Sequence, residues 1–157
     1  MKVLFVLYSD LLKRVDLQDK LEKELELVKK LIGPDSVYAT ITSEMKHFFD
    51  IFPDLVFIRN DKGTFIYGAY KGLRKLRGNA VLLIDGGVSL TKHKLAEFIR
   101  RGKKNILCTG LALIKLVDLD YIIRTMERYK DGDASLSHIM EEVKREYGID
   151  YEMLQEV

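Results

Sequence analysis

The sequence predicts an α/β fold, in which a mostly parallel sheet lies as the middle of three layers with helices on both faces. Short apolar runs, typical of buried strands, alternate along the chain with segments whose apolar residues recur at helical spacing. One run, residues 81–84, is apolar throughout and leads into Asp85-Gly86-Gly87, as a central parallel strand leads into its turn. Ligands of open α/β sheets bind beyond the carboxyl ends of the strands. We therefore expect Asp85 at a ligand site, with Gly86 and Gly87 allowing the backbone to approach the ligand closely.

The bulk composition indicates one globular domain over residues 1–157, with 47% hydrophobic and 32% charged residues. The formal net charge of +2 is too small to indicate a nucleic-acid partner or an anionic membrane surface. Cys108 is the single cysteine, which excludes an internal disulfide and fits a reducing cytoplasm. The first apolar run is too short for a signal sequence or a membrane span. We therefore expect a cytoplasmic protein with no membrane partner, and its Lys- and Glu-rich composition resembles that of thermophile proteins.

Strands and helices are expected to alternate in the first half of the chain. Apolar runs predict strands at residues 3–8, 37–42 and 55–59. Helical spacing predicts helices at residues 17–32 and 65–76, with a short helix or turn at 43–52. Asp16 is expected to cap the first helix, and the turn Asn60-Asp61-Lys62-Gly63 to precede the second.

The second half departs from a simple alternation. Ser89 or Thr91 is expected to cap a helix that ends at Gly102. Gly110 splits two apolar segments at residues 105–109 and 111–116. Two helices follow, one beginning at Asp118 and one over residues 136–147, and the chain is expected to end in an edge strand at 151–157.

Most common catalytic motifs are missing. His47, His93 and His138 are scattered without metal-ligand spacing, so they predict isolated surface histidines and no zinc site. Cys108 lies in an apolar strand, where a buried inert thiol is expected. The chain contains no Gly-x-Ser-x-Gly elbow, no Gly-x-Gly-x-x-Gly fingerprint and no Walker loop.

Two features at the expected ligand edge of the sheet leave alternatives open. The loop after the first strand holds Lys13 and Arg14, which either bind phosphate oxygens or form a solvated basic loop before a helix. Asp85 either holds a divalent cation through its carboxylate oxygens or caps the following turn.

Taken together, these pieces resemble the GT-A-type nucleotidyltransferases, which include the sugar-phosphate and molybdenum-cofactor nucleotidyltransferases. That family opens with a loop of the form Leu-Ala-Ala-Gly-x-Gly-Thr-Arg-Met followed by a lysine. Leu7 and Arg14 match this pattern and Lys20 lies at a plausible distance for the lysine, while Asp10 and Leu12 replace both glycines. The resemblance implies that Arg14 and Lys20 stabilise phosphate charge during transfer. It also implies that the loop residues bind the nucleotide, here Ser9, Asp10 and Lys13.

Other family motifs are matched in part. Asn60, Gly63 and Thr64 resemble the segment that contacts the base, and Thr109-Gly110 resembles a strand near the acceptor substrate. Asp85-Gly86-Gly87 resembles the family's Asp-Gly-Asp, whose last Asp binds Mg²⁺; Gly87 stands at that position and Asp85 at the less essential first one. The resemblance implies a nucleotide-diphospho-sugar transferase-like fold with an antiparallel edge strand, and Mg²⁺ as cofactor at Asp85.

Three functions follow from these observations. The first is transfer of a nucleoside monophosphate from an NTP to a phosphorylated sugar or similar acceptor. The second is a catalytically inactive relative that binds a nucleotide or sugar phosphate or acts as a regulatory module. The third is a flavodoxin-like binding domain, although the first loop lacks the Ser/Thr/Gly-rich phosphate site of that class. A second copy of the chain is a further candidate partner. Phe48, Phe49 and Phe52 either pack in the core, which is the commoner use, or form an interface.

Overall fold

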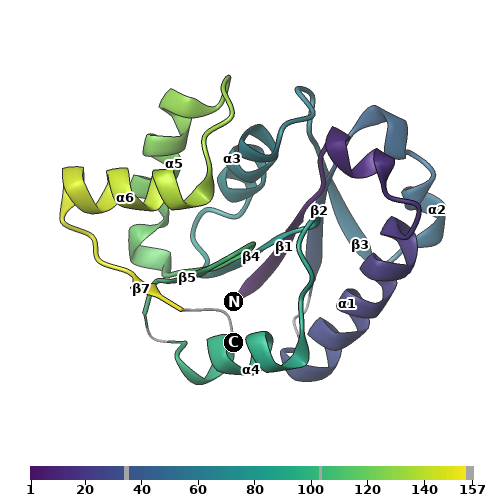
Figure 1. Ribbon diagram of the computed structural model, residues 1–157, viewed down its shortest axis with the longest axis horizontal. Helices are drawn as coiled ribbons and strands as arrows, with labels where there is room; N and C mark the ends of the chain where they lie inside the picture. The colour runs from purple at the N-terminus through teal and green to yellow at the C-terminus, as the bar shows by residue number, and fades with distance from the viewer. Residues whose placement is uncertain (34–35, 103, 155–157) are drawn as a thin grey trace.

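The sheet predicted from the apolar runs is present in the computed structural model, which describes residues 1–33, 36–102 and 104–154 (Figure 1). In this part of the chain seven strands form one sheet, in the order β3-β2-β1-β4-β6-β5-β7. Their bounds are β1 Lys2–Val6, β2 Val37–Ile41, β3 Leu55–Arg59, β4 Val81–Asp85, β5 Ile106–Cys108, β6 Leu111–Ile114 and β7 Glu152–Met153.

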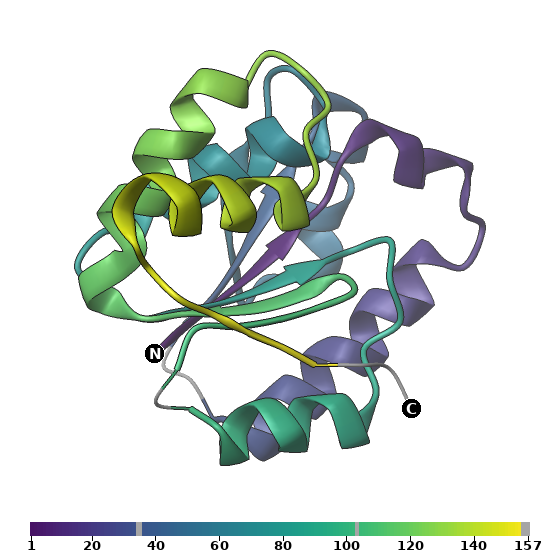
Figure 2. The same cartoon turned by 60° about the vertical axis from the view of Figure 1, so that its left-hand side comes forward.

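Helices cover both faces of the sheet, which Figure 2 shows nearly edge-on between its two helical layers. One layer consists of α1 (Leu17–Leu31), α2 (Phe48–Ile51) and α4 (Lys92–Arg100). The other consists of α3 (Phe65–Lys75), α5 (Leu119–Tyr129) and α6 (Leu136–Tyr147). Short 3-10 turns lie between these elements: η1 (Ser9–Lys13), η2 (Ser43–Met45) and η3 (Leu116–Asp118). No helix of the described residues is long and apolar enough to cross a membrane.

The position of β1 in the middle of the sheet, between the two helical layers, explains why its sequence is apolar throughout. Val3 and Phe5 face the core beneath α1 and α4, whereas Leu4 and Val6 face the core beneath α3 and α5. All four are fully buried. A parallel strand covered on both faces needs apolar residues at every position, because alternate side chains enter opposite cores.

The predicted fold class is confirmed, with the antiparallel part of the sheet on one side of β4. β3, β2, β1 and β4 are parallel to one another, and β6 runs antiparallel to both β4 and β5. Gly110 makes this reversal, since it has a φ of +74° in the tight turn that joins β5 to β6. A flavodoxin-like architecture is excluded, because its sheet has a different strand order and no such reversed strand.

Several boundaries differ from the sequence-based expectation. The first strand ends at Val6, two residues before Tyr8, and the residues after Tyr8 form η1. Asp16 precedes α1 but makes no capping hydrogen bond, because its carboxylate pairs with Arg14. Thr91 and not Ser89 caps α4.

The chain's last elements and its phenylalanine cluster also differ in detail. The final strand β7 has two residues and runs parallel to β5, and residues 155–157 of the predicted strand lie outside the described residues. Core packing is confirmed for Phe48 and Phe52, which are buried, whereas Phe49 is exposed and remains for an interface.

Candidate functional site

Asp85 ends β4 at the edge of the sheet where a ligand site is expected. Tyr8 donates its hydroxyl hydrogen to Asp85 Oδ1 at 2.8 Å, and the Gly87 N–H donates to the same oxygen at 2.7 Å. The backbone N–H of Asp85 donates to the Gly110 carbonyl at 2.8 Å. Asp85 therefore caps its own turn, which is one of the two roles that the sequence left open.

Tyr8 is the residue at this site that the sequence did not single out. Its ring packs edge-on against Phe65 at 5.7 Å between centroids, while its hydroxyl reaches Asp85. Burial, followed by the hydrogen bond to Asp85, raises the pKa of Tyr8 above its usual range. As the last residue of an apolar run, Tyr8 carried no sequence signal for this contact.

The raised pKa of Tyr8 predicts a specific loss of stability in alkali. The folded protein keeps the Tyr8 proton to higher pH than the unfolded chain, in which tyrosine has a pKa of about 10. The stabilisation is therefore fully present below pH ~10 and is lost as the pH rises above it. Urea unfolding on both sides of that pH should show a steeper loss in the wild type than in Tyr8→Phe. Equal losses in the two proteins would contradict the contact.

Gly86 and Gly87 are closely approached by the chain itself. A Cβ on Gly86 would lie 2.5 Å from Leu7 Cδ2 and 2.9 Å from the Val6 carbonyl oxygen. A Cβ on Gly87 would lie 2.4 Å from the Tyr8 hydroxyl and 3.0 Å from Leu11 Cδ2. The close approach that the glycine pair permits is therefore made by the first loop of this chain.

Gly87→Ala is expected to lower the free energy of unfolding by about 1–3 kcal/mol, because the new methyl group overpacks this contact. In a Tyr8→Phe background the loss should be smaller, because the oxygen in the way is gone. Urea denaturation of the four proteins of this cycle measures the coupling between the two positions. Gly132→Ala is the matched control, because its nearest atom lies 3.7 Å away. Additive losses at positions 8 and 87 would rule out the contact.

Arg14 connects the first loop to the glycine turn. Its Nη1 donates to the Gly87 carbonyl at 3.0 Å, and its Nε and Nη2 donate to Asp16 at 3.0 and 3.1 Å. The hydrogen bond between the two side chains raises the pKa of Arg14 and lowers that of Asp16. All these contacts are made to other residues of the same chain. Of the residues predicted to bind phosphate, Arg14 is the one that bonds to the glycine turn.

Lys20, which the resemblance assigns to phosphate binding, pairs with a carboxylate of its own helix. Its Nζ lies 2.8 Å from Glu24 Oε2 in a pair whose side chains are 9% and 6% exposed. The same Glu24 oxygen accepts a hydrogen bond from the Leu90 N–H at 3.1 Å. The ammonium group therefore serves a buried ion pair that joins α1 to the segment before α4.

Asn60 organises the turn predicted to contact a base. Its Nδ2 donates to the Leu7 and Thr64 carbonyls at 3.1 and 2.9 Å, and its Oδ1 accepts from the Gly63 N–H at 3.0 Å. Thr64 caps α3 by accepting from the Tyr67 N–H at 3.2 Å. The polar groups of Asn60 and the Thr64 hydroxyl thus hold the turn and the start of α3.

The other predicted site residues offer more exposed groups. Asp10, Lys13 and Thr109 are exposed, and Ser9 is partly buried with its N–H donating to the Gly63 carbonyl at 2.8 Å. The structure thus joins two sets at the carboxyl edge of the sheet. The first set consists of Asp85, Gly86, Gly87, Gly110 and Arg14. The second set consists of Ser9, Asn60, Gly63 and Thr64.

The donor atoms around Asp85 do not form a divalent-cation site by themselves. Asp85 Oδ1 already accepts two hydrogen bonds, from Tyr8 and Gly87. The described residues hold no group of three or more His, Cys, Asp or Glu that could ligate a metal. Mg²⁺ is usually held by one or two carboxylates together with substrate phosphates and water, so Asp85 supplies one carboxylate and the remaining oxygens would have to come from a ligand and from water.

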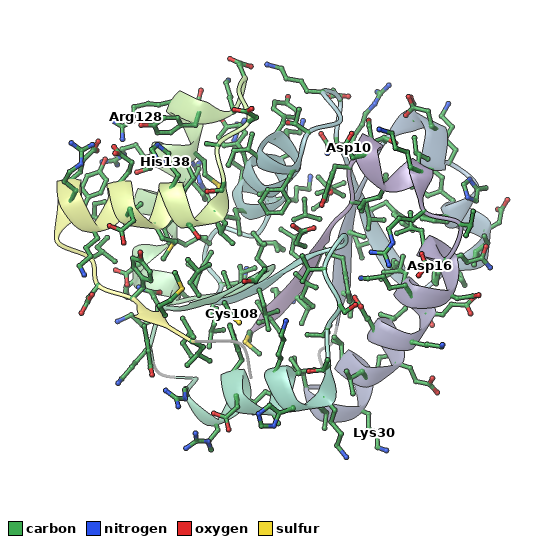
Figure 3. The ribbon with its side chains drawn as sticks, in the orientation of Figure 1. Asp10, Asp16, Lys30, Cys108, Arg128 and His138 are labelled. Carbon is green, nitrogen blue, oxygen red and sulfur yellow. The ribbon has the colours of Figure 1, made fainter. Side chains whose placement is uncertain are left out.

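The three histidines are exposed and the cysteine is buried. Figure 3 shows His138 on α6 and Asp10 on η1, far apart across the molecule, with Cys108 over the sheet between them. Cys108 is buried in β5, and the ring of His138 packs edge-on against Tyr129.

Comparison with known proteins identifies the fold. No family model matches the chain, and no curated protein sequence matches it. Among solved structures, the chain is similar to a 4-diphosphocytidyl-2C-methyl-D-erythritol synthase from Anaerococcus prevotii, with a TM-score of 0.70 and 10% identity. That alignment covers 99% of this chain and 88% of the synthase.

Two further solved structures have the same arrangement. The CTP:phosphocholine cytidylyltransferase LicC from Streptococcus pneumoniae gives a TM-score of 0.67 at 9% identity, over 99% of this chain and 90% of the enzyme. Rv0371C from Mycobacterium tuberculosis, in complex with manganese, gives 0.61 at 14% identity, over 99% of this chain and 86% of that protein. The chain thus shares its fold with nucleotidyltransferases of the nucleotide-diphospho-sugar transferase type.

Proposed function

We propose that this protein is a nucleotidyltransferase-like binding module, which takes up a nucleotide or a sugar phosphate and does not transfer a nucleotidyl group. Its fold is that of a 4-diphosphocytidyl-2C-methyl-D-erythritol synthase and of a CTP:phosphocholine cytidylyltransferase, each aligned over 99% of the chain. The observation that carries the proposal is the contact of Tyr8, Leu7 and Leu11 with the Asp85-Gly86-Gly87 turn. The groups that the resemblance assigns to catalysis are engaged in ion pairs and hydrogen bonds within the chain, buried for Lys20 and partly exposed for Arg14.

The cationic side chains that the resemblance assigns to phosphoryl transfer already have partners within the chain. Transfer depends on cations that neutralise charge on the phosphates as it develops. Lys20 is buried against Glu24, and Arg14 is hydrogen-bonded to Asp16 and to Gly87. The exposed residues Lys13 and Thr109 remain for a ligand at this edge of the sheet.

Nucleotidyl transfer from an NTP to a phosphorylated sugar is the second candidate. The fold likeness favours it, and manganese in the Rv0371C complex is consistent with a divalent cation in this fold. In that case the first loop would have to leave the turn, and Asp85 would hold Mg²⁺ together with phosphate oxygens. Arg14 and Lys20 would then stabilise the phosphate charge.

Isothermal titration with the four common NTPs and with a sugar 1-phosphate, each with Mg²⁺ and with EDTA, separates the two candidates. The binding module should give heat with at least one of these ligands, at an affinity that EDTA and Asp85→Asn leave unchanged. Lys13→Glu should weaken that binding, and Lys30→Glu should not, because Lys30 lies at the far end of α1 from Asp10 (Figure 3). No heat with any ligand would contradict both candidates, and metal-dependent binding lost in Asp85→Asn would favour the enzyme.

A further inference from the structure

At the outer edge of the sheet, β3 presents backbone groups that pair with no other strand of the described residues. Asn60 donates its N–H to the Ile41 carbonyl at 2.8 Å, so the backbone groups of Asn60 face β2. The backbone groups of successive strand residues alternate in direction, so those of Phe57 and Arg59 face away from the sheet. β2 is the one described strand that pairs with β3. An edge of this kind is a template on which another strand can pair.

A basic hollow of about 410 Å³ lies beside this edge, on the face covered by α3. Five cationic side chains line it: Arg59, Lys71, Arg74, Lys75 and Arg77. Within the described residues, the carboxylates paired with these cations are Asp61, near Arg59 and Lys71, and Asp120, near Arg77. The hollow therefore has an excess of positive charge on a chain whose formal net charge is only +2.

A second hollow, of about 340 Å³, lies on the opposite face of the same edge. It is lined by Ile41 and by the rings of Phe49 and Phe57, which pack edge-on at 4.8 Å, and also by Thr42, Ser43, Lys46 and Arg59. Phe49 is 50% exposed, which is unusual for so large an apolar side chain. The first hollow, with five cations, thus favours acidic groups. The second offers an apolar surface on the rings of Phe49 and Phe57, with Lys46 and Arg59 beside them, and Arg59 lines both hollows.

We propose that the β3 edge binds an extended segment of a partner protein in which acidic and apolar residues alternate. A strand paired to β3 would direct successive side chains to opposite faces of the sheet, and so into the two hollows in turn. Backbone hydrogen bonds to Phe57 and Arg59 would provide affinity, and the two hollows would provide specificity. About five residues are enough, because β3 itself has five.

The charge of this edge disfavours a second copy of the chain as the occupant. Pairing β3 with β3 of another copy would bring the two basic hollows together, and like charges placed in contact across an interface oppose binding. The partner segment is therefore expected to carry the complementary negative charge. This inference concerns a different edge of the molecule from the nucleotide or sugar-phosphate site.

A labelled, end-capped peptide of alternating Glu and Val tests the proposal on the full chain by fluorescence anisotropy and amide hydrogen exchange. The peptide should bind, with an affinity that falls as salt rises, and should slow exchange at the amides of Phe57 and Arg59. A peptide of the same composition, with its Glu and Val in two separate blocks, should bind much more weakly. N-methylation of the alternating peptide along its pairing edge should abolish binding, and along its other edge should not.

Matched protein variants test the role of the basic hollow. Lys75→Glu should weaken binding of the alternating peptide about tenfold, because it places like charges together. Lys144→Glu, on α6 at the other end of the sheet, should leave it unchanged. The proposal is overturned if the alternating peptide does not bind, if the block peptide binds equally well, or if Phe57 and Arg59 gain no protection. It is also overturned if an oligonucleotide binds as tightly, or if the protein dimerises through β3.

Discussion

Glu24→Ala is expected to lower the free energy of unfolding by about 3–5 kcal/mol, because it leaves the buried ammonium of Lys20 without its counter-ion. The substitution also removes the acceptor of the Leu90 N–H, which adds an unsatisfied donor. Urea denaturation, or the shift in thermal midpoint, measures the loss. Glu22→Ala on the same helix is the control, because Glu22 is exposed and should change stability by less than about 0.5 kcal/mol.

A double variant separates the charge of this pair from its hydrogen bond. Lys20→Met with Glu24→Gln removes both charges and keeps an acceptor for Leu90, so it should recover most of the stability lost in Glu24→Ala. If Glu24→Ala is no more destabilising than Glu22→Ala, then the pair is not buried as described. Lys20 would in that case be available for a phosphate.

Asn60→Ala should lower the free energy of unfolding by about 3 kcal/mol, because it removes three hydrogen bonds and leaves the Gly63 N–H without its partner. Asn60 is 2% exposed, so water cannot easily replace these bonds. Gly68 supports the arrangement, since a Cβ there would lie 2.7 Å from Asn60 Nδ2. Chemical denaturation measures the effect.

Two further variants sharpen the test at Asn60. Asn60→Asp keeps an acceptor for Gly63 but places a carboxylate against the Leu7 and Thr64 carbonyls, so it should destabilise the protein to a similar extent. Asn79→Ala is the control, because the Asn79 side chain bonds carbonyls at a partly exposed turn and should cost about 1 kcal/mol or less. Equal effects at positions 60 and 79 would show that the Asn60 turn is not a fixed element.

The order of the elements could be predicted from the sequence, because burial on both faces leaves a simple pattern. The run at 81–84 and the helical stripe at 17–32 correspond to β4 and α1 within a residue. The direction of β6 could not be predicted, since it depends on which strand the 111–114 segment pairs with, and pairing is a long-range choice. The end of β1 was also misplaced, because Thr40 bonds the backbone of Leu7 through its side chain.

The placement of Asp85 at the carboxyl end of β4 could be predicted, but its contacts could not. Asp85 lies at the carboxyl edge of the sheet because it is the last residue of a parallel strand. Its bond to Tyr8 joins residues 77 positions apart, which no local pattern reports. The spacing of Lys20 and Glu24 is typical of a helix pair, but its burial depends on packing that brings Leu90 within reach.

Release of pyrophosphate tests the central claim most directly. The purified full chain is incubated with each common NTP, Mg²⁺ and a panel of sugar phosphates, and pyrophosphate is measured against a protein-free blank. If the first loop stays packed against the Asp85 turn, no NTP should yield pyrophosphate above the blank. Release that scales with protein and disappears in Asp85→Ala would contradict the claim and make the chain an active nucleotidyltransferase.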